Sequence, residues 1–364
     1  MKTVCGINHG ERCLSWFHRH CPFLLHALSI SYAWVVRSRL YLYQQGWLRT
    51  HRLPCPVASV GNLTVGGTGK TPVTMWLANW LHSKGIRVAI LSRGYRRTST
   101  ADYVLVSNRD KVLATHLEVG DEPFLMAQSC PGVVVAVGRD RYQLGLWVLQ
   151  QMEIDCFILD DGYQHIRLHR DCNLLLFDAL DLEGIGALFP AGRLREPLSA
   201  ASRATAILAT RVDQSLKAGQ VLQAVEAAIG QKIPSINIEF HTQSIKHLRT
   251  WQTESGPWMA GKRAVIFSGI GNAFAFRQTV TEMGVFVVQE LEFPDHYSYS
   301  AEDIHVIRAA AQGQQVDVVL TTEKDAVKIL TFLHEEDNMW AVQIETNITK
   351  GKEHLQQTLE CLRL

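Results

Sequence analysis

The residues with the clearest chemical pattern form a glycine-rich segment that ends in lysine and threonine. A short apolar run at 56–60 precedes three glycines between 66 and 69, and Lys70 and Thr71 then open an apolar pattern with helical spacing. A strand, a glycine-rich turn, a Lys-Thr pair and a helix are the context of a P-loop. Glycines allow backbone N–H groups to surround phosphate oxygens without a Cβ in the way. We therefore predict a nucleoside-triphosphate site here.

Each residue of this loop has an expected role. Lys70 would reach the terminal phosphates, and the Thr71 hydroxyl would occupy one position on Mg²⁺. The usual GxxxxGK[ST] pattern begins with glycine, and this chain has Thr64 at that position. The predicted nucleotide contacts are Thr64, Val65, Gly66, Gly67, Thr68, Gly69, Lys70 and Thr71.

Two adjacent acids follow another apolar run. Residues 156–159 lead into Asp160 and Asp161, and the polar pair Gln164 and His165 follows shortly after. Adjacent carboxylates repel each other unless a cation or a base lies between them. A carboxylate at the end of a second strand binds the metal in P-loop enzymes, so we interpret these acids as metal ligands. The alternative is a capping pair at the end of a strand.

Further apolar runs, at 88–91, 132–136, 173–177 and 204–209, each end in polar residues. Repetition of this pattern predicts a parallel sheet with one ligand-binding edge. The fold class that we expect is α/β, with a P-loop NTPase-like, mainly parallel sheet and helices on both of its faces.

Length and composition narrow the class of protein. A chain of 364 residues and 40.9 kDa favours two domains. Its 36 basic and 35 acidic residues argue against nucleic acid as a partner. The eight cysteines are too scattered for a disulfide scaffold, so we expect a reducing, cytoplasmic compartment.

The N-terminal part differs from the rest in charge. Residues 1–53 hold seven Lys or Arg and one acid, a net charge of +6, whereas the remainder has 29 basic and 34 acidic residues. The apolar run 22–36 is too short to span a bilayer. We predict an amphipathic helix over 22–45 that lies in an anionic membrane interface. The alternative is a helix packed on the protein's own core. The expected apolar face comprises Leu24, Leu28, Tyr32, Val35, Leu40 and Tyr43.

The second half has a different character. A helical pattern at 213–230, an alternating strand at 236–240 and apolar runs at 263–267 and 316–320 predict a smaller α/β domain. The Gly-x-Gly after the run at 263–267 lacks the third glycine of a dinucleotide fingerprint, because that position holds Phe274. We interpret it as structural or substrate-facing.

Several motifs together resemble one known family. The segments PVASVGNLTVGGTGKTP, LSRGY, VGDEP, LDDGYQH, FPAGRLREP, FSGIGN, FPDHY and TTEKDAVK occur in order. This set is similar to the tetraacyldisaccharide 4′-kinases of lipid A biosynthesis. The resemblance implies an ATP- and Mg²⁺-dependent kinase, peripheral on the cytoplasmic face of a Gram-negative inner membrane. Its implied acceptor is the 4′-hydroxyl of a lipid-linked disaccharide, tetraacyldisaccharide 1-phosphate, and its product is lipid IVA.

The resemblance also implies residue roles. Asp121 would accept the proton of the sugar hydroxyl, and His296 would orient or tune that carboxylate. From the residues alone, Asp121 would be a helix N-cap and His296 a loop histidine. Family position further implies Lys70 as a catalytic residue, Arg93 and Arg195 as phosphate contacts, Thr71, Asp160, Asp161 and Glu196 as metal ligands, and Gln164 and His165 close by.

These observations predict four parts of the chain. They are an N-terminal extension (1–21), the membrane-interface helix (22–45), the P-loop core (46–212) and a smaller C-terminal α/β domain (213–364) that closes the cleft. Because Asp121 and His296 fall in different domains, we expect the active site between them, with hinge segments near 236–242 and 338–345.

Two other functions compete with the lipid kinase. One is a P-loop ATPase switch or chaperone, which would hydrolyse ATP without a sugar acceptor. The other is a soluble small-molecule kinase, in which the N-terminal helix is only structural. For the lipid kinase we expect a monomer.

Overall fold

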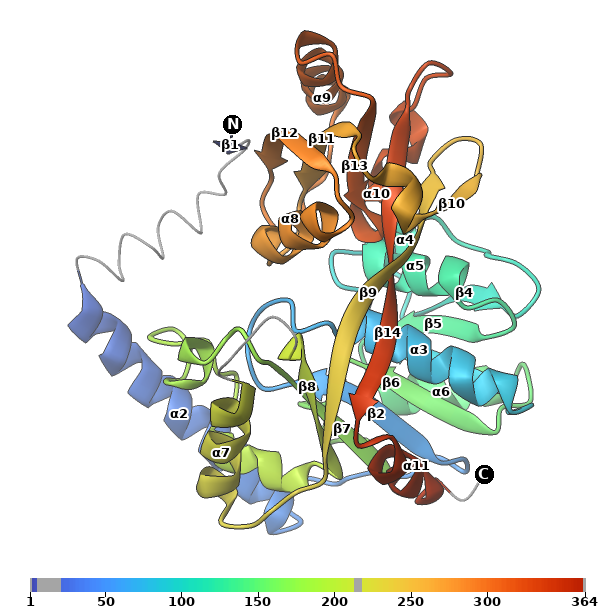
Figure 1. The fold of residues 1–364 in the computed structure, drawn as a ribbon. Coiled ribbons are helices and arrows are strands. Elements are labelled where there is room, and N and C mark those ends of the chain that lie inside the picture. Colours follow the sequence, from blue (N-terminus) through green and yellow to red (C-terminus); the bar gives the residue numbers. More distant parts are fainter. Residues whose placement is uncertain (1, 5–20, 213–217, 363–364) are drawn as a thin grey trace. The chain divides into compact units, whose positions relative to one another are not determined.

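A computed structural model describes residues 2–4, 21–212 and 218–362 (Figure 1). The chain divides into a larger compact unit, Ser15–Phe240 with Thr346–Leu364, and a smaller one, Met1–Leu14 with His241–Glu345. The division therefore lies at 240/241 and 345/346 rather than at the expected 212/213. The chain stays in the larger unit after residue 212 because strand β9 (Ser235–His247) pairs in parallel with β8 (Ala206–Thr210).

The larger unit is built on a mainly parallel sheet. Each central strand follows an apolar run of the sequence, and β2, β3, β5 and β6 are buried along their whole length. The edge strand β4 runs antiparallel to its neighbour, β5. The strand order is β9, β8, β7 (Cys172–Asp178), β2 (Val57–Asn62), β6 (Cys156–Asp160), β3 (Val88–Ser92), β5 (Val134–Gly138) and β4 (Tyr103–Asn108).

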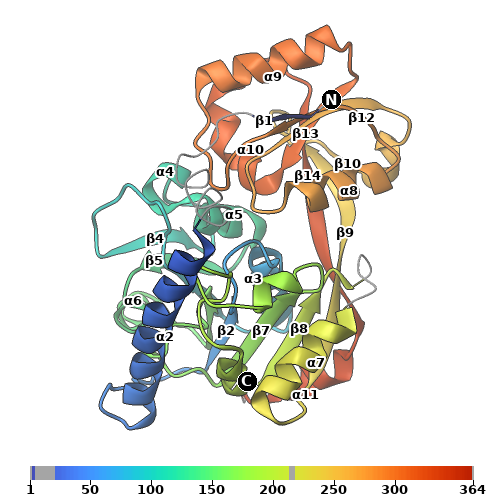
Figure 2. The ribbon, with the colours of Figure 1, turned by 90° about the vertical axis from the view of Figure 1, so that its left-hand side faces the viewer.

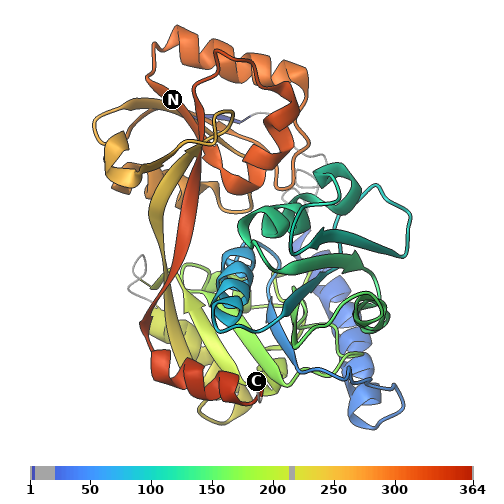
Figure 3. The same ribbon diagram turned by 90° about the vertical axis from the view of Figure 1, so that its right-hand side faces the viewer.

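Helices cover both faces of this sheet. Figures 2 and 3 show α2 and α7 on one face and α3 and α11 on the other. Helices on both faces explain why the strands are apolar throughout rather than alternating. The helices are α2 (Pro22–Gln44), α3 (Lys70–Ser83), α4 (His116–Val119), α5 (Asp121–Ser129), α6 (Arg141–Leu149), α7 (Ala218–Ile229) and α11 (Lys352–Glu360), with short 3₁₀ turns at Glu183–Ile185 and Leu198–Arg203.

The smaller unit repeats the α/β plan. Its parallel strands follow the order β1 (Lys2–Val4), β12 (Phe286–Glu292), β11 (Arg263–Ser268), β13 (Val318–Thr322) and β14 (Met339–Lys350), while β10 (Thr253–Ser255) pairs antiparallel with β9. Its helices are α8 (Ala273–Glu282), α9 (Ala301–Gly313) and α10 (Glu323–Ile329), with 3₁₀ turns at Gly256–Met259 and Leu330–Phe332.

The expected α/β class is therefore confirmed, and every apolar run that was expected to form a strand overlaps one. The edge strand β4 and strand β12 were not predicted, although each contains a short apolar run, at 103–106 and 285–288; most of their residues are only partly buried. Most of the predicted N-terminal extension lies outside the described residues. Within the described part of the chain, no helix combines the length and the apolar character needed to cross a bilayer.

Candidate active site

The glycine-rich loop joins β2 to α3 in the larger unit, as its sequence predicts. Gly66 and Gly69 have φ values of 122° and 81°, which lie in the region that favours glycine. Gly69 is the N-cap of α3, so the first turn of that helix begins at Lys70. Free N–H groups at a helix N-terminus, beside a left-handed glycine turn, form an anion-binding concavity.

A second segment, around Arg193, holds the glycine-rich loop near Val65. The Val65 N–H donates to the Arg193 carbonyl at 2.7 Å, and the Arg193 guanidinium donates back to the Val65 carbonyl, also at 2.7 Å. A Cβ at Gly66 would collide with that guanidinium. Thr64, at the position of the missing first glycine, forms a β-bridge with Leu194. The threonine therefore links the loop to the Arg193 segment through an isolated β-bridge.

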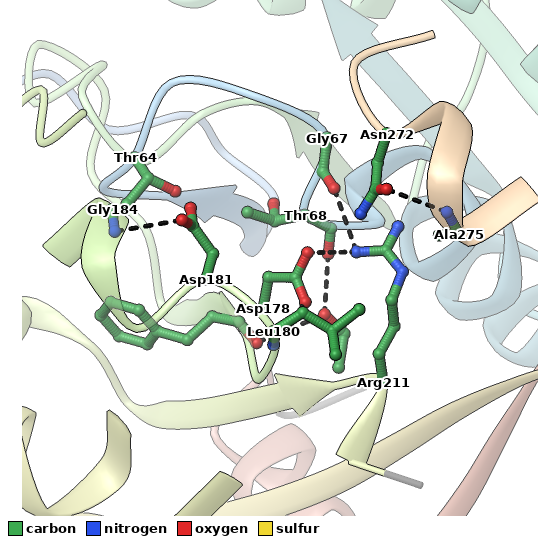
Figure 4. A network of polar contacts seen from close by, with 12 residues as sticks. Thr64, Gly67, Thr68, Asp178, Leu180, Asp181, Gly184, Arg211, Asn272 and Ala275 are labelled. Atoms are coloured by element: carbon green, nitrogen blue, oxygen red, sulfur yellow. Dashed lines mark hydrogen bonds and ion pairs between the residues drawn. The ribbon is translucent and has the colours of Figure 1, made fainter. Parts of the chain in front are cut away.

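The inner side of the loop is fixed by the end of β8 (Figure 4). The Thr210 hydroxyl donates to the Thr68 carbonyl at 3.1 Å, and the Arg211 guanidinium donates to the Gly67 carbonyl at 3.2 Å. Arg211 also forms an ion pair with Asp178, which ends β7. The sequence offered Thr210 and Arg211 only as one of several polar clusters. The structure shows that they hold the phosphate loop in place.

Opposite charges converge at the carboxyl end of β6. Lys70 Nζ lies 3.7 Å from Asp161 Oδ1, and Arg195 Nη1 lies 2.8 Å from Asp161 Oδ2. Asp161 has a φ of 46°, an unusual left-handed backbone that is common at functional sites. Burial alone would raise the pKa of Asp161, but Lys70 and Arg195 outweigh it and lower the pKa below its ordinary value. Asp161 is thus an ionised carboxylate held between two cations.

The neighbouring Asp160 has the opposite electrostatics. Burial first, and then the charges of Glu122 and Asp161, raise its pKa to about 7. The Ser92 hydroxyl donates to its Oδ2 at 3.0 Å, which only partly offsets this rise. A buried carboxylate crowded by two others is a position where a cation would be stabilising.

Replacement of Asp160 therefore has a pH-dependent effect on stability. The folded-state pKa of about 7 lies above the ordinary 3.8, so the cost of ionising Asp160 develops as pH rises from about 4 to above 7. Asp160→Asn is expected to raise the melting temperature at pH 8 in EDTA, by removing a cost of at most about 4 kcal/mol. The gain should vanish below pH 4. A melting-temperature difference that stays constant from pH 4 to pH 8 would contradict this.

Arg141 is a site residue that the sequence did not single out. It is the first residue of α6 and is 7% exposed, and its Nε has no hydrogen-bond partner among the described residues. Burial and the nearby charge of Arg93 lower its pKa to about 10, although Asp161 and Asp160 oppose that shift. A buried cation beside two carboxylates, with an unused N–H, suits a phosphate contact. The sequence signal that could have identified Arg141 was its place among the polar residues that follow β5.

Gln164 and His165 lie beside this group. The Gln164 amide donates to the Asn62 carbonyl at 2.8 Å, and its Oε1 lies 3.5 Å from Arg195 Nη1. Burial and surrounding arginines, Arg141 above all, lower the pKa of His165 to about 3. His165 is therefore neutral, and its buried Nε2 has no partner in the described structure.

Glu196 has different surroundings from Asp160 and Asp161. It is 2% exposed and forms an ion pair with Arg203. The structure thus gives Glu196 a cationic partner, whereas its predicted role was metal binding.

The oxygen atoms at the carboxyl end of β6 fit a magnesium ion. Asp161 Oδ1 is buried and accepts no hydrogen bond from the described residues, and Asp160 is adjacent. Among described residues there is no group of three or more His, Cys, Asp or Glu side chains suited to a metal. Mg²⁺ in nucleotide sites takes only one or two carboxylates, together with phosphate oxygens and water, so this set is sufficient.

The two predicted catalytic residues belong to different units. Asp121 opens α5 of the larger unit, and its Oδ1 accepts the Glu122 N–H at 3.0 Å. Gly120, with a φ of 95°, holds the cap position that the sequence assigned to Asp121. His296, in the smaller unit, follows β12 and has a φ of 56°. Their pairing stays a prediction.

Comparison with known proteins decides the family. The sequence model of the tetraacyldisaccharide-1-P 4′-kinases (LpxK) matches residues 21–362. The chain belongs to this family. It is 40% identical to the tetraacyldisaccharide 4′-kinase of Pelobacter propionicus (86% of this chain, 84% of that one) and 38% identical to that of Geobacter metallireducens (90% and 95%). The lipid A kinase predicted from the motifs is thereby confirmed.

A solved structure of the family supports the nucleotide site. LpxK from Aquifex aeolicus, crystallised in complex with ATP, matches this structure with a TM-score of 0.74 and 33% identity, over 94% of this chain and 99% of that one. The α/β fold and ATP binding are thus those of an LpxK kinase.

Proposed function

We propose that this lipid A kinase binds Mg-ATP at the carboxyl edge of the larger sheet and transfers its γ-phosphate to the 4′-hydroxyl of tetraacyldisaccharide 1-phosphate, which yields lipid IVA. The observation that carries the site is the convergence of Lys70, Asp161 and Arg195 beside the glycine loop. Cations there would neutralise charge on the transferred phosphoryl group. Transfer of labelled γ-phosphate from Mg-ATP to the lipid tests the function.

Magnesium would be held by the Thr71 hydroxyl and the carboxylates of Asp160 and Asp161. Bound there, it would supply charge neutralisation at the phosphate oxygens. The other charged residues at this edge of the sheet have different tasks in this proposal. Arg93, Arg141 and Arg195 would contact phosphate, and Glu196 would hold Arg203 beside the Arg195 segment.

Asp121 would act as the general base. A sugar hydroxyl is a poor nucleophile at neutral pH, so a positioned carboxylate that removes its proton accelerates attack on phosphorus. His296 would orient or tune this carboxylate. A double-mutant cycle between the two residues measures such coupling directly, because independent residues give additive losses.

The N-terminal helix would place the enzyme on a membrane surface. The face of α2 that packs on the protein is narrow and contains Leu25, Ser29 and Ala33. Of the six residues of the expected apolar face, Tyr32, Leu40 and Tyr43 turn partly toward the protein. The exposed apolar residues of α2 are Phe23, Leu24, Leu28, Ile30, Trp34, Val35 and Tyr41.

Charge and position favour a lipid surface as the partner of this exposed face. On a helical wheel, Arg37 and Arg39 flank the exposed apolar residues on opposite sides, as expected for an interfacial helix beneath anionic headgroups. The buried side of α2 contacts the active-site segments. Tyr32 donates to the Arg195 carbonyl at 2.9 Å, and Arg39 donates to the Gln164 carbonyl at 2.9 Å. A lipid-bound α2 would therefore hold the phosphate site close to the lipid substrate.

Polar replacements on this face are expected to weaken membrane binding. Ile30→Gln with Trp34→Gln should lower partitioning into anionic vesicles about 10-fold or more, since two large apolar side chains lose their burial in lipid. Vesicle sedimentation measures the effect. Leu113→Gln with Leu117→Gln is the matched control, because both leucines are exposed elsewhere in the larger unit. Equal losses in the two variants would show that α2 is not the membrane contact.

We also propose that the enzyme is peripheral on the cytoplasmic face of a Gram-negative inner membrane and acts as a monomer. The exposed apolar residues of α2 and the bacterial origin of the relatives support this location.

A further inference from the structure

Two sequence motifs of the smaller unit meet at one buried carboxylate, and a third is joined to them through a glycine. Asp325, in the TTEKDAVK segment, lies in α10 and is fully buried. Its Oδ2 accepts the Gly269 N–H at 2.9 Å, which links it to the FSGIGN segment after β11. Oδ2 also accepts the Thr322 hydroxyl at 2.8 Å. Its Oδ1 accepts from Lys328 at 2.9 Å, and Lys328 is itself 8% exposed.

The same glycine holds the backbone of His296, in the FPDHY segment. The Gly269 carbonyl accepts the His296 N–H at 3.1 Å. A φ of 56° is costly for a residue with a side chain and persists only where its surroundings enforce it. A Cβ at Gly269 would lie 3.1–3.2 Å from the Pro294 carbonyl, the Tyr299 hydroxyl and Asp325. Only glycine fits this position without displacing its neighbours.

A second residue of α10 holds the histidine ring. Lys324 Nζ lies 3.2 Å from His296 Nε2 and 3.6 Å from Asp295 Oδ1. An ammonium group can only donate hydrogen bonds, so Nε2 of the ring is the acceptor in this contact. Lys324 thereby holds the orientation of the ring.

We propose that α10 is the support of His296, with Asp325 as the positioning residue for its backbone through Gly269 and Lys324 as the positioning residue for its ring. This inference rests on the proposed catalytic role of His296. It gives a function to the FSGIGN and TTEKDAVK segments. Displacement of a catalytic group by about 1 Å costs roughly 10²-fold in rate, so loss of either contact should lower kcat.

Paired variants separate positioning from stability. Asp325→Leu with Lys328→Met and Asp325→Asn with Lys328→Met both remove the buried ion pair without leaving an unpaired charge. Only the asparagine can still accept the Gly269 N–H. We expect the leucine pair to lower kcat roughly 10- to 100-fold with both KM values unchanged, and the asparagine pair to restore most of this loss. Circular dichroism and melting curves verify that both variants fold.

A double-mutant cycle that combines the leucine pair with His296→Ala tests whether Asp325 acts through His296. If Asp325 acts through His296, the leucine pair causes no further loss of kcat in the His296→Ala enzyme. The inference is overturned if the Asp325→Leu, Lys328→Met enzyme folds and has wild-type kcat. It is also overturned if this pair and His296→Ala lower kcat independently, so that their fold-losses multiply when they are combined. The proposed role of His296 fails separately, if His296→Ala alone retains wild-type kcat.

If the leucine pair does not fold, a comparison of Lys324→Met with Lys324→Gln tests the contact to the histidine ring instead. Gln retains a donor for Nε2 and should preserve more of kcat; equal values for the two variants would refute the ring contact.

Discussion

Lys70→Ala is expected to lower kcat/KM for ATP by about 10²- to 10³-fold, the usual loss when one preorganised donor to a transition-state oxygen is removed. Lys70 follows directly after the glycine turn, and its ammonium group lies 3.7 Å from Asp161 in a largely buried position. An alanine here removes the phosphate contact and also one of the cations that keep Asp161 ionised. Steady-state kinase assays at varied ATP, with direct measurement of ATP binding, give both effects.

The matched control for this variant lies at the other end of the same helix. Lys84 is the exposed C-cap residue of α3, so Lys84→Ala removes an equal charge far along the helix from the glycine loop. Its kinetics should match the wild type. A Lys70→Ala enzyme as active as Lys84→Ala would mean that the loop does not bind the transferred phosphate.

Asp121→Asn is expected to reduce kcat by about 10²- to 10⁴-fold, the usual contribution of a general base. Asparagine keeps the shape of the side chain and can still accept the Glu122 N–H, so α5 should remain folded. The base is active only when ionised, which gives the wild-type pH–rate profile an acidic limb. The limb should disappear in Asp121→Asn, because the remaining activity no longer depends on that ionisation.

The neighbouring acid Glu118 serves as the control for Asp121. It is exposed and caps α4 through Thr115. Glu118→Gln should retain both the rate and the acidic limb. An Asp121→Asn enzyme that keeps an unchanged acidic limb would limit Asp121 to a positioning role.

Much of the larger unit could be predicted from local patterns. A strand covered by helices on both faces must be apolar throughout, so β2, β3, β5, β6 and β7 are visible as short apolar runs. Parallel strands bring their carboxyl ends to one edge, so the polar residues after each run could be assigned to one site. The order of strands and polar residues along the chain is therefore enough to place Lys70 and Asp161 at the same site.

The remaining features depend on tertiary contacts that leave no local signal. Arg141 matters because it is buried beside Asp160 and Asp161, and burial of an arginine cannot be read from its neighbours in sequence. Glu196 has Arg203 as its partner, seven residues further along the chain at the end of the 3₁₀ turn Leu198–Arg203, and no local pattern marks this pair. Apolar residues lie nearly all around α2, so which face packs inward is decided by contacts such as Tyr32 with Arg195.

The most direct test of this account follows the fate of the γ-phosphate. Purified enzyme is incubated with γ-labelled Mg-ATP and tetraacyldisaccharide 1-phosphate in mixed micelles, and labelled lipid and free phosphate are measured together. We predict label in the lipid, ATP consumption that depends on the acceptor, and loss of both in Lys70→Ala. ATP hydrolysis without labelled lipid would contradict the account and favour an ATPase switch built on the same fold.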